Sequence, residues 1–168
     1  MLFRSEAESV ALVSGERIGG GLAADGHGEL SKLLLGNHPA AALRLARDTG
    51  VLGVMIPELK ASFGFDQRNP HHAYTVDEHT FVVVQAAADS GTSLAVRLAA
   101  LFHDAGKPAV AWLGRDGFLH FYREPGKSAR GHEAEGAELA ASALRRLRYP
   151  NVLRDEVVAL VQIGRAHV

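Results

Sequence analysis

From residue 29 onward, the chain is mostly a succession of helix-length segments joined by short connections. The connections carry Gly, Pro, Ser or Thr, such as Thr92-Ser93 before the apolar segment 94–102 and Pro150 before the last helix-length segment. Ser and Thr favour the first residue of a helix, whereas Gly and Pro favour the positions that flank its ends. Helices in succession with short connections predict an all-α fold.

The expected elements divide the chain into two units. Helices are expected at about residues 29–35, 40–49, 51–59, 77–88, 94–102, 132–147 and 153–161. The segment 62–76 is rich in Gly, Asp, Asn, Pro and His, which indicates an ordered loop. An Asp116-Gly117 turn between two short apolar runs predicts a small hairpin at about 110–122, or simply a loop. We therefore expect a helical extension over residues 6–62, followed by a compact helical bundle over residues 63–162.

Composition limits the possible functions. Hydrophobic residues make up 47% of the chain and charged residues 22%, which is enough apolar content for a folded core. The net charge of −1 gives no global positive field, so any contact with RNA must come from a local patch. The absence of cysteine excludes disulfides and thiolate metal ligands. No run approaches the roughly 18 apolar residues of a membrane span, so we expect a cytoplasmic protein without a membrane partner.

Both ends of the chain resemble a translated sequencing adapter. The closing segment from Ile163 to Val168 has no helical or strand period, although it directly follows an apolar helical segment. The opening segment from Met1 to Ser5 matches the same adapter in the reverse complement. We therefore predict that residues 1–5 and 163–168 are adapter-derived, and we do not count His167 as a metal ligand. Sequencing of the source locus tests this prediction.

The adjacent pair His103-Asp104 is the strongest chemical signal in the sequence. It ends the apolar segment 94–102, and Gly106 and Lys107 follow at once. Neighbouring helix residues point about 100° apart, because a helix has roughly 3.6 residues per turn. Two such side chains can bind one ion only near a helix end, which Gly106 is expected to provide. An imidazole nitrogen and a carboxylate oxygen together suit a divalent ion such as Mg, Mn, Ni, Fe or Zn.

Two further histidines extend the predicted metal site. His79 lies on the preceding helix, and two antiparallel helices would bring it to His103 and Asp104. His132 begins the next long helix. A bound ion would lower the pKa of a water molecule and neutralise phosphate oxygens, which places Asp104 in a catalytic centre. Lys107 would meet a substrate phosphate, or else be an ordinary solvated cation at a helix end.

The segment with His79, His103-Asp104 and Gly106-Lys107 resembles the HD domain, a superfamily of metal-dependent phosphohydrolases. Motifs outside this segment resemble the RNA-binding neck and body of bacterial tRNA nucleotidyltransferases and poly(A) polymerases, the family that adds or repairs the CCA end of tRNA. They are Ser14-Gly15-Glu16-Arg17-Ile18, Glu29-Leu30, Ala42-Leu43-Arg44-Leu45, Asp48-Thr49-Gly50, Pro57-Glu58-Leu59, Gly64-Phe65-Asp66-Gln67 and Tyr74-Thr75-Val76. The resemblance implies part of that body over residues 6–62 and an HD domain over residues 63–162.

Three departures from the family pattern limit what the resemblance implies. The catalytic head, with its glycine-rich strand and paired aspartates, does not occur in this sequence, so we expect no nucleotide addition by this chain alone. The glycine-rich stretch 19–28 interrupts the usual run of motifs. HD domains typically complete the metal shell with an Asp from a later helix, which should follow at about Val161. We therefore expect weak metal binding and weak or absent activity.

Three functional interpretations remain open. The first is a tRNA nucleotidyltransferase whose HD domain hydrolyses phosphate esters such as 2′,3′-cyclic ends, and the second is a non-catalytic tRNA-binding body with relic HD residues. The third is a stand-alone HD phosphohydrolase. The motifs of residues 14–70 disfavour this interpretation, because they resemble the RNA-binding neck and body. The candidate RNA contacts, whose alternative is a solvated helix end, are Arg145, Arg146 and Arg148, with Arg97 and Arg123. The expected partner is tRNA or a phosphate-ester substrate.

Overall fold

The computed structural model describes residues 28–68, 73–122 and 130–164, and most of these residues are helical. In chain order the elements are α2 (Glu29–Leu35), α3 (Pro39–Asp48), α4 (Val51–Met55), the 3-10 helix η2 (Pro57–Ser62), α5 (Val76–Asp89), α6 (Leu94–Phe102), α7 (Lys107–Val110), β1 (Trp112–Leu113), β2 (Leu119–His120), α8 (His132–Arg146) and α9 (Asn151–Gln162). The two strands are antiparallel, with Trp112 opposite His120. The all-α prediction is confirmed, and the structure also has the small hairpin.

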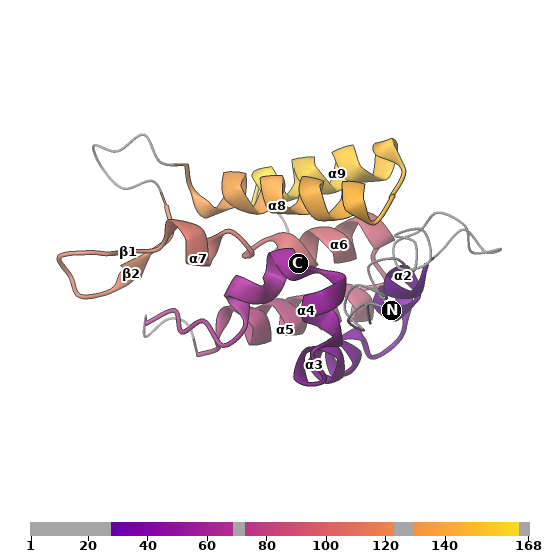
Figure 1. The fold of residues 1–168 in the computed structure, drawn as a ribbon, viewed down its shortest axis with the longest axis horizontal. Coiled ribbons are helices and arrows are strands. Elements are labelled where there is room, and N and C mark those ends of the chain that lie inside the picture. Colours follow the sequence, from indigo (N-terminus) through magenta and orange to yellow (C-terminus); the bar gives the residue numbers. More distant parts are fainter. Residues whose placement is uncertain (1–27, 69–72, 123–129, 165–168) are drawn as a thin grey trace, which may run out of the picture.

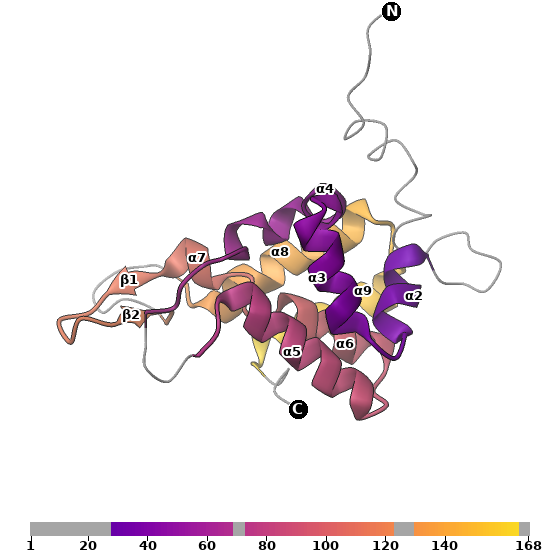
Figure 2. The same ribbon diagram turned by 90° about the horizontal axis from the view of Figure 1, so that it is seen from below.

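Helix α6 forms the centre of the fold. Helices α8 and α9 lie on one side of it, and α5 with α3 and α4 lies on the other (Figure 1). It packs against α2, α5, α8 and α9, and its residues Leu98, Leu101 and Phe102 are almost completely buried. A helix that is apolar on every side needs neighbours on every side, which explains this central place. The hairpin projects at the end of the molecule opposite α2 (Figure 2).

Two local features differ from the pattern expected from the sequence. Helix α4 ends at Met55 and η2 begins at Pro57, so proline divides what was expected as one helix. Proline lacks the amide hydrogen that the helix needs and clashes with the preceding turn. The four-residue helix α7 is too short to show an apolar period in the sequence. Among the described helices, none combines the length and the apolar character needed to cross a lipid bilayer.

Arg97 connects the N-terminal helices to the bundle. Its side chain is buried, and its Nη1 donates a hydrogen bond to the carbonyl of Leu34 at 2.7 Å while its Nε donates to the carbonyl of Thr92 at 3.1 Å. Leu34 lies in the last turn of α2, where carbonyls lack a partner within the helix. Arg97 therefore satisfies backbone carbonyls in the interior, and the expectation that it contacts RNA phosphates is wrong. The hydrophobic core likewise runs without a break from α2 into the bundle.

A charged network joins α3 to the start of α5. The Nη1 atom of Arg47 lies 2.7 Å from Asp77 Oδ2 and 2.7 Å from Glu78 Oε1, and Arg44 Nε lies 2.8 Å from Glu78 Oε2. Asp77 is buried and also accepts hydrogen bonds from the hydroxyl of Thr75 and the backbone amide of Gly64. Burial alone would raise the pKa of Asp77, but the hydrogen bonds from Thr75 and Arg47 outweigh it and hold this pKa below its usual range.

Asp77→Asn is expected to lower the free energy of unfolding by about 2 kcal/mol at neutral pH, because Arg47 loses its buried charged partner while it keeps its contact with Glu78. Since the folded-state pKa of Asp77 is depressed, its contribution is complete above the unfolded pKa of about 3.9 and is lost as the pH falls through the folded value. Urea unfolding at pH 7 and pH 3 should therefore show a smaller difference between wild type and variant at pH 3. Asp48→Asn removes an exposed partner of the same Arg47 and should cost less than about 1 kcal/mol; equal losses for both variants would contradict the account.

Candidate metal centre

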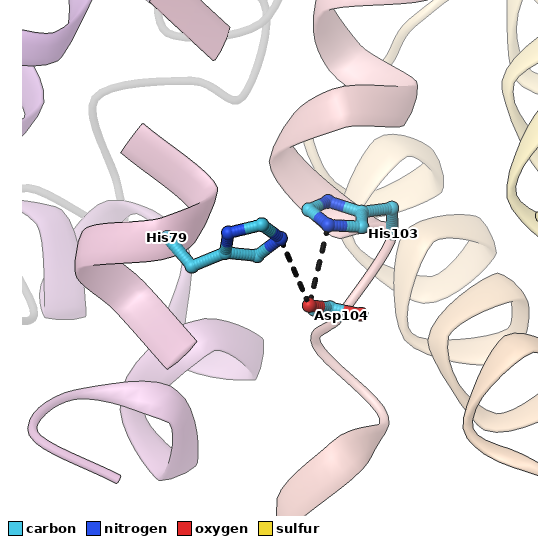
Figure 3. A group of neighbouring side chains, drawn as sticks. All are labelled: His79, His103 and Asp104. Carbon is cyan, nitrogen blue, oxygen red and sulfur yellow. Dashed lines mark ion pairs between the residues drawn. The ribbon is translucent and has the colours of Figure 1, made fainter. Parts of the chain in front are cut away.

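Three helices bring the predicted ligands together. His79 lies in the first half of α5, His103 caps the C-terminal end of α6 with Asp104 directly after it, and His132 is the first residue of α8. A short turn joins α5 to α6, so the two helices pack side by side and the start of one meets the end of the other. Figure 3 shows the rings of His79 and His103 turned toward the carboxylate of Asp104 from two different helices.

The distances define a compact group of three side chains. His79 Nε2 lies 3.6 Å from Asp104 Oδ2, and His103 Nε2 lies 3.3 Å from the same oxygen (Figure 3). One ligand atom from each of the three residues lies within 4.8 Å of the other two. His132 approaches the other carboxylate oxygen, with its Nε2 3.8 Å from Asp104 Oδ1, but it lies outside this group of three.

Backbone carbonyls orient two of the imidazole rings. His103 Nδ1 lies 2.7 Å from the carbonyl oxygen of Ala100, and His132 Nδ1 lies 2.9 Å from the carbonyl oxygen of Phe121. A carbonyl oxygen only accepts, so each Nδ1 must carry the hydrogen. A neutral ring then carries its lone pair on Nε2, which is the form that binds a cation, whereas a protonated ring donates from Nε2 to Asp104. Histidines that bind metals are commonly held in this way by a hydrogen bond at the other ring nitrogen.

The spacing of the group suits a divalent ion. Tetrahedral ligands about 2.1 Å from a zinc ion lie about 3.4 Å from one another, close to the 3.3 and 3.6 Å separations found here. Two imidazole nitrogens and a carboxylate oxygen form a donor set that suits Mn, Fe, Ni, Zn or similar ions. The chemistry of the three side chains and the two histidine–carboxylate separations therefore fit a metal ion.

Asp104 is ionised although it is buried. It is 2% exposed, and burial alone would raise its pKa. The contacts with His103 and with the ammonium of Lys107 outweigh burial and hold the pKa of Asp104 well below its usual range. The carboxylate is therefore negatively charged at neutral pH, which is the form that binds a cation.

Lys107 lies inside the protein, beside the centre. Its side chain is nearly buried, with Nζ 2.8 Å from Asp104 Oδ2, 2.8 Å from Gln67 Oε1 and 5.1 Å from the centre of the Phe121 ring. The interpretation of Lys107 as a solvated cation at a helix end is therefore wrong. Gln67 was not identified as a site residue from the sequence, although it lies within the motif Gly64-Phe65-Asp66-Gln67.

Two glycines allow the backbones around the centre to approach closely. A Cβ atom at Gly106 would lie 2.3 Å from the carbonyl oxygen of His132 and 2.6 Å from the amide nitrogen of Gly136, and one at Gly136 would lie 3.0 Å from the carbonyl of Phe102. Gly106 has φ −77°, which any residue can adopt, so it does not serve as a left-handed helix stop. Its function is close packing against α8, which places His132 beside Asp104.

The structure gives the arginines at the C-terminal end of α8 different surroundings. Arg145, Arg146 and Arg148 are all exposed. Arg146 is already engaged: its Nη2 lies 2.7 Å from Glu58 Oε2 and its Nη1 donates to the carbonyl of Met55 at 3.1 Å, so it ties α8 to the α4–η2 segment. Arg123 lies outside the described residues. Contact of Arg145, Arg146 and Arg148 with RNA stays a prediction.

Comparison with known proteins identifies the fold of this centre. The sequence profile of the HD domain family matches residues 76–163, which is more than half of the chain and contains the predicted ligands His79, His103, Asp104 and His132. The chain belongs to the HD domain family. A second profile, described as the probable RNA and SrmB-binding site of polymerase A, matches residues 2–63, so the HD domain follows an RNA-binding region. Both halves of the resemblance predicted from the sequence are confirmed.

The HD domain and the preceding region also match curated relatives. A multifunctional CCA protein from Azoarcus sp. (strain BH72) is 37% identical over 143 residues, which cover 83% of this chain and 31% of the relative. A CC-adding tRNA nucleotidyltransferase from Thermus thermophilus is 38% identical over 140 residues, which cover 80% of this chain and 30% of the relative. The chain thus spans about a third of the length of these relatives. No solved structure matches it.

Proposed function

We propose that this chain is the RNA-binding and HD part of a tRNA nucleotidyltransferase, and that its HD centre hydrolyses phosphate esters. The observation that carries the proposal is the convergence of His79 Nε2 and His103 Nε2 on one oxygen of Asp104, in a donor set that fits a divalent ion. The whole activity of the relatives, addition of CC or CCA to tRNA, is proposed for the protein to which this chain corresponds.

The proposed centre assigns a role to each side chain. His79, His103 and Asp104 would hold the ion, with His132 as a further ligand from α8. A divalent ion at this place supplies an acidified water molecule and positive charge for phosphate oxygens. The Nδ1 hydrogen bonds of His103 and His132 keep their rings oriented without the ion. Lys107 adds a positive charge beside Asp104, where it would offset the charge of a substrate phosphate.

A non-catalytic tRNA-binding body with relic HD residues is the competing proposal. The burial of Asp104 favours a functional metal site. Burial of an ionised carboxylate costs free energy of folding unless cations and hydrogen bonds surround it. Nothing in the described helices favours a stand-alone HD protein, because α2 and α3 pack directly onto the bundle and belong to the region matched by the RNA-binding profile.

The experiment that tests the proposal is metal-dependent hydrolysis of 2′,3′-cyclic AMP. The chain is stripped with a chelator, dialysed and assayed with Mg, Mn, Ni, Fe(II) or Zn ions in separate reactions. We expect the stripped protein to be inactive and at least one ion to restore phosphate-ester cleavage at a measurable rate. Equal and metal-independent rates in all reactions, at the level of buffer alone, would overturn the phosphohydrolase proposal and favour the non-catalytic one.

Arg145 provides a test of the RNA-binding proposal. Arg145→Gln should weaken tRNA binding severalfold and lower the salt dependence of binding by about one released counterion, if this exposed cation contacts a phosphate. The same substitution at Arg115, an exposed cation near the hairpin turn, serves as the charge-matched control. Filter binding of tRNA between low and moderate salt measures both effects. Identical slopes for the two variants and the wild type would exclude Arg145 from the interface.

A further inference from the structure

Gln67 lies in the loop between η2 and α5, beside the Lys107 ammonium that contacts Asp104. It belongs to the segment between η2 and α5, is 1% exposed, and accepts a hydrogen bond from Lys107 Nζ at 2.8 Å through its Oε1. Its Nε2 donates to the carbonyl of Tyr74 at 3.0 Å. An ammonium only donates and a carbonyl only accepts, so these partners fix the orientation of the amide. Gln67 is thereby held at both ends.

From these contacts we infer that Gln67 is a positioning residue. It holds Lys107 beside the metal centre and weakens the ion pair between the Lys107 ammonium and the Asp104 carboxylate. The inference rests on the proposed function, because it concerns the ion that Asp104 would bind. In this role Gln67 acts through Lys107 and does not need to contact the ion or the substrate.

The ammonium of Lys107 lies in a buried environment. Lys107 is only 6% exposed, and burial of an unpaired ammonium costs several kcal/mol. The described contacts offer Nζ one charged oxygen, on Asp104, and one neutral oxygen, on Gln67, both at 2.8 Å, together with the ring of Phe121. The neutral acceptor allows Lys107 to stay in the interior while it shares its hydrogens between two oxygens.

The ammonium and the proposed ion use the same oxygen of Asp104. Asp104 Oδ2 is the atom that faces His79 and His103, and it is also the atom that Lys107 contacts. If Gln67 is removed, the ammonium has Asp104 as its remaining oxygen among these contacts. A stronger pair between Lys107 and Asp104 competes with a cation for the carboxylate, so metal affinity should fall.

Hydrogen bonds also link the Gln67 segment to the helix that carries His79. Gln67 Nε2 donates to the carbonyl of Tyr74, and the amide of Val76, the first residue of α5, donates to the carbonyl of Phe65. His79 stands one turn further along that helix. Gln67 therefore connects the helix that carries His79 to the cation that contacts Asp104.

The test is a double-mutant cycle on metal affinity, measured with Zn and Mn ions by isothermal titration calorimetry of the full chain. Gln67→Leu should weaken binding about tenfold, in the range found for residues that support metal ligands. In a Lys107→Met background the same substitution should change the affinity less than twofold, because no ammonium then competes for Asp104. Gln67→Glu keeps an acceptor for Lys107 and should bind metal at least as tightly as the wild type.

A matched control separates positioning from loss of stability. Tyr149→Phe removes another buried hydrogen bond, between the hydroxyls of Tyr149 and Ser31 at 2.9 Å, and should lower stability without changing metal affinity. Wild-type affinity in Gln67→Leu, or an equal loss in both Lys107 backgrounds, would overturn the role of Gln67 alone. Absence of metal binding by the wild type would overturn the proposed metal centre, and the inference with it.

Discussion

Replacement of His103 by alanine is expected to weaken the binding of divalent metal strongly and to abolish metal-dependent cleavage of phosphate esters. His103 Nε2 lies 3.3 Å from Asp104 Oδ2, and its ring is fixed through Nδ1 by the carbonyl of Ala100. Loss of residues that merely support metal ligands lowers affinity about 10- to 100-fold. Loss of a ligand should exceed that range, so we expect an affinity loss of more than about 100-fold by calorimetry.

The control for this substitution is His120→Ala on the hairpin. His120 also contacts a carboxylate, with Nε2 2.9 Å from Asp116 Oδ2, but neither residue belongs to the three-residue group. Metal affinity and cyclic phosphodiesterase rate should stay within twofold of the wild type. Circular dichroism and thermal unfolding verify that both variants are folded. A His103→Ala variant that retains wild-type affinity would exclude this residue as a ligand.

Gly106→Ala is expected to have the largest effect on the structure of the centre. The new Cβ would stand 2.3 Å from the carbonyl oxygen of His132 and 2.6 Å from the amide of Gly136, and both of these atoms belong to the backbone of α8. A clash with backbone cannot be relieved by a change of rotamer, so α8 must move away from the end of α6. We expect a loss of about 3 kcal/mol or more in the free energy of unfolding and weaker metal binding, because His132 moves with α8.

A glycine in α4 offers a matched control. A Cβ at Gly53 would meet only the flexible side chain of Lys60 and the ring of Phe63, at 3.0 Å or more. Since alanine favours helix more than glycine by roughly 1 kcal/mol, Gly53→Ala should leave stability unchanged or slightly raised. Urea unfolding of both variants measures the contrast. Equal stability of Gly106→Ala and the wild type would refute the close packing of α7 against α8.

Most of the helices were predictable because their signals are local. The apolar segment before His103 predicts α6, with Ser93 at its start, and in the structure the Ser93 side chain accepts a hydrogen bond from the amide of Val96. The Asp116-Gly117 turn likewise indicates the hairpin, and Gly117 has a φ of 82°. The division of α4 from η2 follows from Pro57, but the sequence pattern alone left the helix continuous across it.

The metal centre was predictable in part. The adjacent pair His103-Asp104 and the preceding His79 are visible in the sequence, and the structure brings them together. The burial of Lys107, its bond to Gln67 and the contact of Gly106 with α8 depend on residues 26 to 40 positions apart that meet only after the helices pack. No periodicity or local motif reports such contacts, which is why Gln67 was missed and Gly106 was interpreted as a helix stop.

The central claim is that His79, His103 and Asp104 hold a divalent ion. Crystals of the chain soaked with Zn ions, with anomalous diffraction recorded on both sides of the zinc edge, test it most directly. We expect one strong anomalous peak within coordination distance of Nε2 of both histidines and of a carboxylate oxygen of Asp104. An empty centre in crystals that carry zinc elsewhere, for example at His120 and Asp116, would contradict it.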